Sequence, residues 1–464
     1  MEYRDSYSNK LLNCSTTSTS CKLQSRSVLA VFCVLFSLIY AGSGAGATYE
    51  IYPATVDSRE EFEAVANSLK PGDELILHGG VYSQSARRAV TAKGTADKPI
   101  VIRAADGEEP ILIRSGDHID RYNNIEFIDC SYLTIRGIKF RGGSSGVRFI
   151  RGHHITFEAC EISQTGNNAL TMNSGNCDAF VIRKNHIHHT GLSNRRSTEG
   201  EGMYIGSHSG SYITTNTIVE GNYIHHLRGT SSGGNDGIEF KFGSYGNIIR
   251  NNIIHDTNIS KKYPGIFVYG GGKGINIVEG NVIWNAGEGI QVVSDAIIRN
   301  NIIFNCEMTG ITAAPHVAVP YVRNVRIVNN TIVNHPRGVL IRWNKASDMV
   351  FANNAVYCPE STAIDASGIA NSIACANYIE GRLVGATIDD SQFFNGETIS
   401  AVFTDPAKNN YWPRPDSVLI GHADSEHAPN VDFNGTRRKP PFDVGAYESE
   451  GNTSNPGRPV RANP

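Results

Sequence analysis

The phrase "RNNIIHD" at residues 250–256 recurs in altered form along the middle of the chain. Every copy centres on an asparagine that precedes a short, mostly apolar run. The other copies are "RKNHIHH" (183–189), "EGNYIHH" (220–226), "EGNVIWN" (279–285), "RNNIIFN" (299–305), "VNNTIVN" (328–334) and "ANNAVYC" (352–358). Their intervals of 20 to 37 residues are typical of solenoids, in which each repeat is one turn of a coil.

A second phrase stands between these copies. Each version has a glycine followed by alternating apolar residues, which indicates a half-buried strand. The versions are "EGMYI" (201–205), "DGIEF" (236–240), "PGIFV" (264–268), "EGIQV" (288–292), "TGITA" (309–313) and "RGVLI" (337–341). Such short strands cannot bury an apolar face alone, whereas coils stacked about 4.8 Å apart can. The sequence therefore predicts an all-β fold, a parallel β-helix.

The central asparagines are expected to form a column. An asparagine at a sharp inward bend can bond its neighbours in the coils above and below, and it tolerates left-handed backbone. The residues concerned are Asn185, Asn222, Asn252, Asn281, Asn301, Asn330 and Asn354.

A helix is predicted to cover the N-terminal end of the solenoid. Ser58 and Glu61 have the spacing of a capping box, and helical spacing follows at Phe62, Val65, Ala66 and Leu69. This helix would cover the open end of the solenoid. The expected organisation is a targeting segment (1–47), an N-terminal cap with the first strands (48–98), the β-helix with an irregular C-terminal part (99–448) and a disordered tail (449–464).

The targeting prediction comes from the apolar run at residues 28–41, which has the length of a signal peptide. Small residues follow it and place a cleavage site at Ala45-Gly46-Ala47. We expect a secreted or periplasmic protein, and the long leader leaves a membrane-anchored form open. The net charge of −3 indicates neither a nucleic-acid groove nor a polybasic membrane surface.

Six cysteines lie beyond the leader, and they contain no CxxC pair that would indicate a zinc site. Cys130 with Cys160, or Cys358 with Cys375, could bridge neighbouring turns of an exported protein. Buried free thiols are the alternative.

One strand of the repeat carries charges on its outward face. With Gly202, Gly237, Gly265 and Gly289 stacked, Ile238 and Phe240 point inward, because a one-residue slip would turn every apolar side chain outward. Glu239 and Lys241 then lie outside, beside Asp236. The preceding coil adds Glu199, Glu201 and Tyr204, and the following coil adds Phe267 and Tyr269.

Clustered carboxylates repel one another unless a cation intervenes, and an all-oxygen set favours Ca²⁺. The expected metal ligands are Glu199, Glu201, Asp236 and Glu239. Lys241 supplies an amine that can lose its proton and then act as a base. This combination suits β-elimination in a uronate polymer, where the C5 proton lies next to a carboxylate whose charge the cation neutralises.

The repeat pattern over roughly residues 100–360 resembles the right-handed parallel β-helix proteins that include pectate lyases, chondroitinase B and alginate lyases. The segments "LKPGDELILHGGVY" (69–82), "GTADKPIVIRA" (94–104) and "FDVGAYE" (442–448) also look like the ends of such proteins. The stretch "DGIEFKFGSYGNIIRNN" (236–252) is similar to the segment in which calcium-binding acids precede a catalytic lysine. The resemblance implies that Asp236 is a calcium ligand and that Lys241 is the Brønsted base.

The resemblance has one departure. The alginate lyases place an arginine on the following coil, where this chain has "IFVYGGGKG" (266–274). Tyr269 or Lys273 is the candidate replacement, as proton donor or carboxylate clamp. His208 is a further candidate acid, Tyr204 a sugar-stacking residue, and Arg342 a distant subsite contact or a plain surface residue.

The predicted function is that of an exported, monomeric lyase that cleaves an anionic polysaccharide of the pectate or alginate type. A uronan C5-epimerase and a noncatalytic glycan-binding surface protein remain alternatives, because fold does not determine function. The acids and Lys241 could also form solvated ion pairs, worth under about 1 kcal/mol. Histidines recur at one repeat position, as His188, His189, His225, His226 and His255. Either the equivalence of the repeats or the binding of a transition metal would explain this recurrence.

Overall fold

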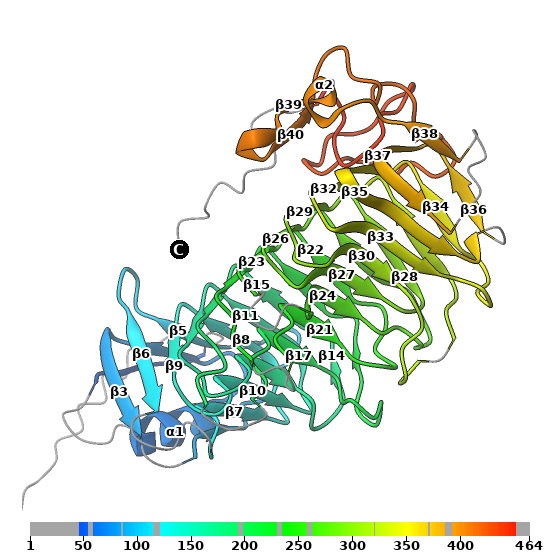
Figure 1. Ribbon diagram of the computed structural model, residues 1–464. Coiled ribbons are helices and arrows are strands. Elements are labelled where there is room, and N and C mark those ends of the chain that lie inside the picture. Colours follow the sequence, from blue (N-terminus) through cyan, green and yellow to red (C-terminus); the bar gives the residue numbers. More distant parts are fainter. Residues whose placement is uncertain are drawn as a thin grey trace, which may run out of the picture. The chain divides into compact units, whose positions relative to one another are not determined.

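The structure is a computed structural model that describes residues 46–53, 59–84, 87–114, 121–193, 198–229, 234–257, 262–319, 321–369, 372–385 and 392–451. The apolar run at 28–41, Ser58 and the tail beyond 451 lie outside these residues. Among the described residues, strands follow one another as coils of a parallel solenoid (Figure 1). No helix within this part of the chain has the length and apolar character needed to cross a membrane.

Three columns of parallel strands make up the coils. The first column is a 15-stranded sheet of β1 (Thr48–Ile51), β2 (Glu74–Leu77), β5 (Ile100–Ala104), β8 (Ser131–Arg136), β11 (His153–Glu158), β15 (Val181–Arg183), β19 (Ile218–Glu220), β22 (Ile248–Arg250), β25 (Asn276–Glu279), β28 (Ala296–Arg299), β31 (Val325–Val328), β34 (Val350–Ala352) and β36 (Ile373–Cys375), with β14 (Cys177–Asp178) and β18 (Thr214–Thr215) beside it.

The other two columns belong to one 23-stranded sheet. The second column is β3 (Gly80–Gln84), β6 (Pro110–Arg114), β9 (Lys139–Arg141), β12 (Glu161–Ser163), β16 (His186–His188), β20 (Tyr223–His225), β23 (Ile253–His255), β26 (Val282–Trp284), β29 (Ile302–Phe304) and β32 (Thr331–Val333). The third column is β4 (Ala89–Val90), β7 (Ile125–Ile128), β10 (Val147–Ile150), β13 (Leu170–Met172), β17 (Met203–Ile205), β21 (Ile238–Phe240), β24 (Pro264–Val268), β27 (Glu288–Val292), β30 (Thr309–Ala313) and β33 (Arg337–Arg342).

The second and third columns merge at the C-terminal end of the solenoid. The long strand β35 (Ala355–Ser367) pairs with both β32 and β33, and β37 (Asn377–Val384) and β38 (Phe393–Asn395) follow it. A short helix α2 (Ile399–Val402), a 3-10 turn (Pro406–Lys408) and the antiparallel pair β39 (Phe403–Asp405) and β40 (Asn410–Pro413) come next. The predicted parallel β-helix is therefore confirmed.

The asparagine column runs through the buried corner of the coils. The side chain of Asn252 donates from Nδ2 to Oδ1 of Asn281 at 3.0 Å and to the carbonyl of Val219 at 2.9 Å. Its own Oδ1 accepts from the backbone and the side chain of Asn222. The same side-chain bond links every successive pair from Asn185 to Asn377.

One detail of this expectation was wrong. The left-handed conformation belongs to the residue before each column asparagine, such as Asn251 (φ 55°) and Gly280 (φ 64°). The column asparagines themselves do not have positive φ. Most of the column asparagines follow a glycine or an asparagine, because left-handed backbone costs these two residue types little.

Replacing Asn252 by alanine should destabilise the solenoid by about 3 kcal/mol. The change leaves the Asn222 amide and the Val219 carbonyl without their partners, and each buried unsatisfied group costs roughly 1–3 kcal/mol. Differential scanning calorimetry would measure the loss. The control is Asn344→Ala on the exposed surface, for which a change within about 0.5 kcal/mol is expected. Equal Tm values for the two variants would contradict the role of the column.

Both ends of the solenoid are covered. Helix α1 (Arg59–Ser68) buries Phe62, Val65 and Ala66 against the first strands, as predicted. At the other end, the chain returns along the second column, where the amide of Gly445 donates to the carbonyl of Asn353 at 2.8 Å. There Tyr411, Trp412 and Tyr447 pack on Phe304 and its column neighbours.

All six cysteines beyond the leader are free thiols, and five of them are buried. The disulfide alternatives are therefore not formed. The buried-thiol alternative describes all but Cys375, which is half-buried.

Candidate active site

The site is built on three neighbouring strands of the third column. Tyr204 of β17 pairs with Glu239 of β21, which pairs in turn with Phe267 of β24. The stacked glycines make this close approach possible: a Cβ on Gly237 would lie 2.4 Å from the carbonyl oxygen of Gly265. The predicted register, with Ile238 and Phe240 inside and Glu239 outside, is confirmed.

Three carboxylates converge on the outer side of these strands. Glu201, Asp236 and Glu239, called here the acid trio, each offer an oxygen, and these oxygens lie within 4.8 Å of one another. The trio is buried: only 2%, 3% and 2% of these residues is exposed, respectively.

The trio is electrostatically unfavourable by itself. Burial raises the pKa of Glu201 and Asp236 above their ordinary values, and the charge of Glu239 raises both further. Glu201 Oε2, Asp236 Oδ1 and Glu239 Oε2 are buried without a hydrogen-bond partner. Buried unsatisfied oxygens are costly, and three of them at one point fit the coordination of a hard divalent cation.

Lys241 places its amine against this trio. It follows β21 directly, is 6% exposed, and forms an ion pair with Glu239. The Nζ atom also lies 4.4 Å from the centre of the Tyr204 ring and 5.1 Å from that of Tyr269. The amine is thus held between two aromatic rings and an acid.

The two tyrosines keep their protons. Burial raises the pKa of both phenols, and the charge of Glu239 raises them further. Tyr269 also hydrogen-bonds Glu239. Burial raises the pKa of this acid, and the contact with Lys241 and the Tyr269 hydrogen bond oppose that rise. Two neutral phenols therefore flank the amine.

Glu199 was expected in the metal site, but the structure places it at the exposed edge of the trio. Its Oε2 accepts from Asn168 Nδ2 at 3.3 Å, and its charge adds to the raised pKa of Glu201. Its backbone precedes the strand β17, where the chain leaves the coil wall.

The remaining predicted residues lie further out. His208 and Lys273 are exposed on the loops after β17 and β24. Arg342 belongs to the same column as Lys241, four coils on, and forms an ion pair with Asp365 at 2.9 Å. At about 4.8 Å per coil, the backbone of Arg342 is roughly 19 Å from that of Lys241.

Sequence reasoning missed His316, which comes from the loop after β30. Its ring packs edge-on against Tyr269, with the ring centres 4.9 Å apart, and its Nδ1 accepts from the Ala318 amide at 3.2 Å. Burial lowers the pKa of His316, and the charges of Lys241 and His208 lower it further. Nothing in the repeat pattern marks this residue, because the loop has no counterpart in other coils.

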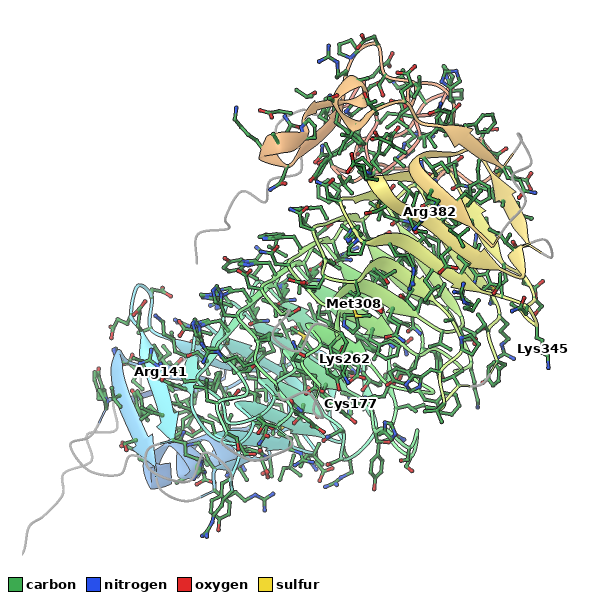
Figure 2. The ribbon with its side chains drawn as sticks, viewed as in Figure 1. Arg141, Cys177, Lys262, Met308, Lys345 and Arg382 are labelled. Atoms are coloured by element: carbon green, nitrogen blue, oxygen red, sulfur yellow. The ribbon has the colours of Figure 1, made fainter. Side chains whose placement is uncertain are left out.

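Figure 2 shows the side chains along these strands, with Lys262 labelled just before β24. Lys262 lies beside Tyr263, at 5.5 Å from the ring centre. It therefore places a positive charge two residues before the start of β24.

Replacing Gly234 by alanine should weaken cation binding at the trio by about tenfold or more, the scale seen when groups around a metal site are disturbed. A Cβ on this residue would lie 2.1 Å from Glu201 Oε1, so the carboxylate must move. Isothermal titration calorimetry with Ca²⁺ checks this. Gly79→Ala before β3 is the control, since its Cβ would meet the Glu108 carboxylate and the Glu109 amide, at 3.3 Å, instead of the trio. Unchanged calcium affinity in Gly234→Ala would argue against the trio as the binding site.

Comparisons with known proteins agree with the architecture. Residues 50–337 match the sequence profile of a family described as "Pel9A-like, right handed beta helix region". No curated protein sequence matches the chain. The family match confirms the right-handed parallel β-helix expected from the repeats.

Solved structures share the fold at low sequence identity. Pectate lyase Pel9A is 14% identical with a TM-score of 0.53, over 86% of this chain and 96% of that one. The alginate lyase from Paenibacillus sp. str. FPU-7 is 20% identical with a TM-score of 0.50, over 65% and 97%. XylC in complex with xylose is 10% identical with a TM-score of 0.59, over 86% and 98%.

Proposed function

This chain belongs to the Pel9A-like right-handed β-helix family, and from that premise we propose that it is a polysaccharide lyase. Its substrate would be a uronate polymer of the pectate or alginate type, cleaved by β-elimination. The observation that carries the proposal is the convergence of three buried carboxylates, each with an unpartnered oxygen, on the Lys241 amine.

Glu201, Asp236 and Glu239 would hold a Ca²⁺ ion, because their oxygens form a hard donor set in a confined space. When bound, the ion neutralises the trio and the carboxylate of the sugar, which favours a neutral Lys241 amine and a more acidic C5 proton. The residues supply three ligand groups, and the rest of a shell of six to eight oxygens is left to substrate and water.

Lys241 acts as the base. Its neutral Nζ takes the C5 proton and becomes an ammonium, the electrons of the C5–H bond form the C4–C5 double bond, and the C4–O4 bond breaks. Tyr204 and Tyr269 hold the amine in place, and their rings stabilise the ammonium through cation–π contacts.

Tyr269 is the proposed proton donor to the departing O4. Its hydroxyl is held by Glu239, next to the base. A phenol with a raised pKa is still able to protonate a sugar alkoxide, which is itself strongly basic. The Lys241 ammonium then returns its proton to the phenolate, so that both groups regain their starting states.

We also propose export, on the basis of the apolar run at residues 28–41 and the small residues after it.

A panel of polymers tests the proposal. The full chain is incubated with pectate, alginate and a neutral glucan, each with Ca²⁺ or with a chelator. Ultraviolet absorbance from the double bond conjugated with the carboxylate should rise for one of the two uronate polymers, only with Ca²⁺. The neutral glucan serves as the control.

Two outcomes would replace the proposal. Exchange of the C5 proton with deuterated solvent, seen by NMR without any gain in absorbance, would indicate a C5-epimerase. Binding of the uronate polymers without either reaction would indicate a noncatalytic glycan-binding protein.

A further inference from the structure

A second cluster of ligating side chains lies on the second column, away from the strands of the acid trio. Strand β16 carries His186 and His188 on its outward face, and Glu161 of β12 pairs directly with His186. All three side chains are half-buried. The cluster of Glu161, His186 and His188 is called here the histidine cluster.

The donor atoms of this cluster point to one another. One ligand atom from each residue lies within 4.8 Å of the other two, and Glu161 Oε1 is 3.6 Å from His188 Nε2. The rings of His186 and His188 have centres 4.2 Å apart. His186 Nε2 also faces His225 Nε2 of the next coil at 2.8 Å.

The neighbouring residues orient the rings. His188 Nδ1 lies 2.7 Å from His189 Nδ1, which leaves His188 Nε2 directed toward Glu161. Ser163 Oγ donates to Glu161 Oε1 at 3.2 Å. Support of this kind, in which the second ring nitrogen or the carboxylate is held by another group, is typical of metal-ligating histidines.

Repeat equivalence does not account for the set. At the position of Glu161 and His186, the next coils carry Tyr223, Ile253 and Val282. The pair of histidines with an adjacent carboxylate is therefore confined to one place on the solenoid, whereas the single column of His188, His225 and His255 continues as a plain ring stack.

We propose that Glu161, His186 and His188 form a binding site for a divalent transition-metal ion such as Zn²⁺. Two imidazole nitrogens and one carboxylate oxygen suit zinc, and they differ from the all-oxygen set that suits calcium. Three protein ligands leave one position of a tetrahedral ion open to water. Two positively charged side chains also lie near Glu161: Lys139 is 3.6 Å from Oε2, and Arg141 is 3.9 Å from Oε1. A bound metal ion would share the Glu161 carboxylate with them. Arg141 is labelled in Figure 2.

The test titrates Zn²⁺ into the full chain by isothermal titration calorimetry. Within the part of the chain that the structure describes, two other clusters could take the ion, the acid trio and the group of Cys375, Asp424 and His427. The background protein therefore carries Glu201→Gln, Asp236→Asn and Cys375→Ser. One equivalent of Zn²⁺ should still bind. Adding Glu161→Gln or His186→Ala should weaken that binding by about tenfold or more.

The matched control removes two histidines from the first column, through His153→Ala and His154→Ala, which are exposed and pair with each other at 3.1 Å. This control should bind Zn²⁺ as the background does. Circular dichroism verifies the fold of each variant, and Co²⁺ absorption provides a second readout of the ligand set. Undiminished binding in Glu161→Gln and His186→Ala, or an equal loss in the control, would overturn the proposal. The outcome is independent of lyase activity.

Discussion

Replacing Lys241 by arginine should lower the rate of double-bond formation by about 10²–10⁴-fold, the usual contribution of a general base. The guanidinium keeps the positive charge beside Glu239 and between the two tyrosine rings, but it cannot lose its proton in a protein. The expected result is therefore a protein that is folded and still binds calcium and polymer, with almost no turnover. Initial rates from ultraviolet absorbance, on the polymer identified by the panel, measure the effect.

Lys345→Arg is the matched control, because Lys345 is exposed on the loop after β33, away from the strands of the site. Its rate should stay within about twofold of the unmodified chain, in line with the small effects of surface changes. If Lys241→Arg retained most of the activity, the base would have to be another group, and His316, whose ring packs on Tyr269, would be the first to examine.

Neutralising the acid trio should have opposite effects on stability with and without calcium. In metal-free protein, Glu201→Gln with Asp236→Asn should raise the Tm, because the substitutions remove buried charges that repel each other. The same variant should lose the stabilisation by calcium. For the unmodified chain, we expect calcium to stabilise the fold by about 2.7 kcal/mol when free Ca²⁺ is about 100 times the Kd.

The pH dependence of the metal-free chain follows from the same pKa shifts. In the unfolded chain Glu201 and Asp236 ionise near their ordinary pKa values of 4.5 and 3.8, whereas burial raises the pKa of both in the fold. The folded state therefore binds more protons above about pH 4, and its stability falls as the pH rises toward the raised values. Calcium needs ionised ligands, so its stabilising effect should be larger at pH 8 than at pH 5.

Calorimetric scans at the two pH values, with calcium or a chelator, measure these effects. Asp416→Asn with Glu426→Gln removes one aspartate and one glutamate charge from exposed positions and serves as the control. It should leave the calcium response intact. If Glu201→Gln with Asp236→Asn were still stabilised by calcium, the cation would have to bind at another site.

The coil and its register could be predicted from the amino-acid sequence. Period-two alternation after each glycine and the asparagine phrase are local signals, and they repeat in enough turns to identify which side chains face inward. For that reason the placement of Glu239 and Lys241 on one outer face, beside Asp236 and Glu201, followed from the register alone.

The burial of the site and the residues that surround it depend on the packing of the whole fold, and the sequence did not predict them. The sequence could not separate Glu201, which is buried in the trio, from Glu199, which is exposed at its edge, although the two are only two residues apart. It also gave no sign of His316, or of the proximity of Glu161 to His188. These features depend on loops that differ from coil to coil and on side-chain directions across neighbouring coils. A repeat specifies backbone position, whereas burial and side-chain contacts depend on residues far apart in the chain.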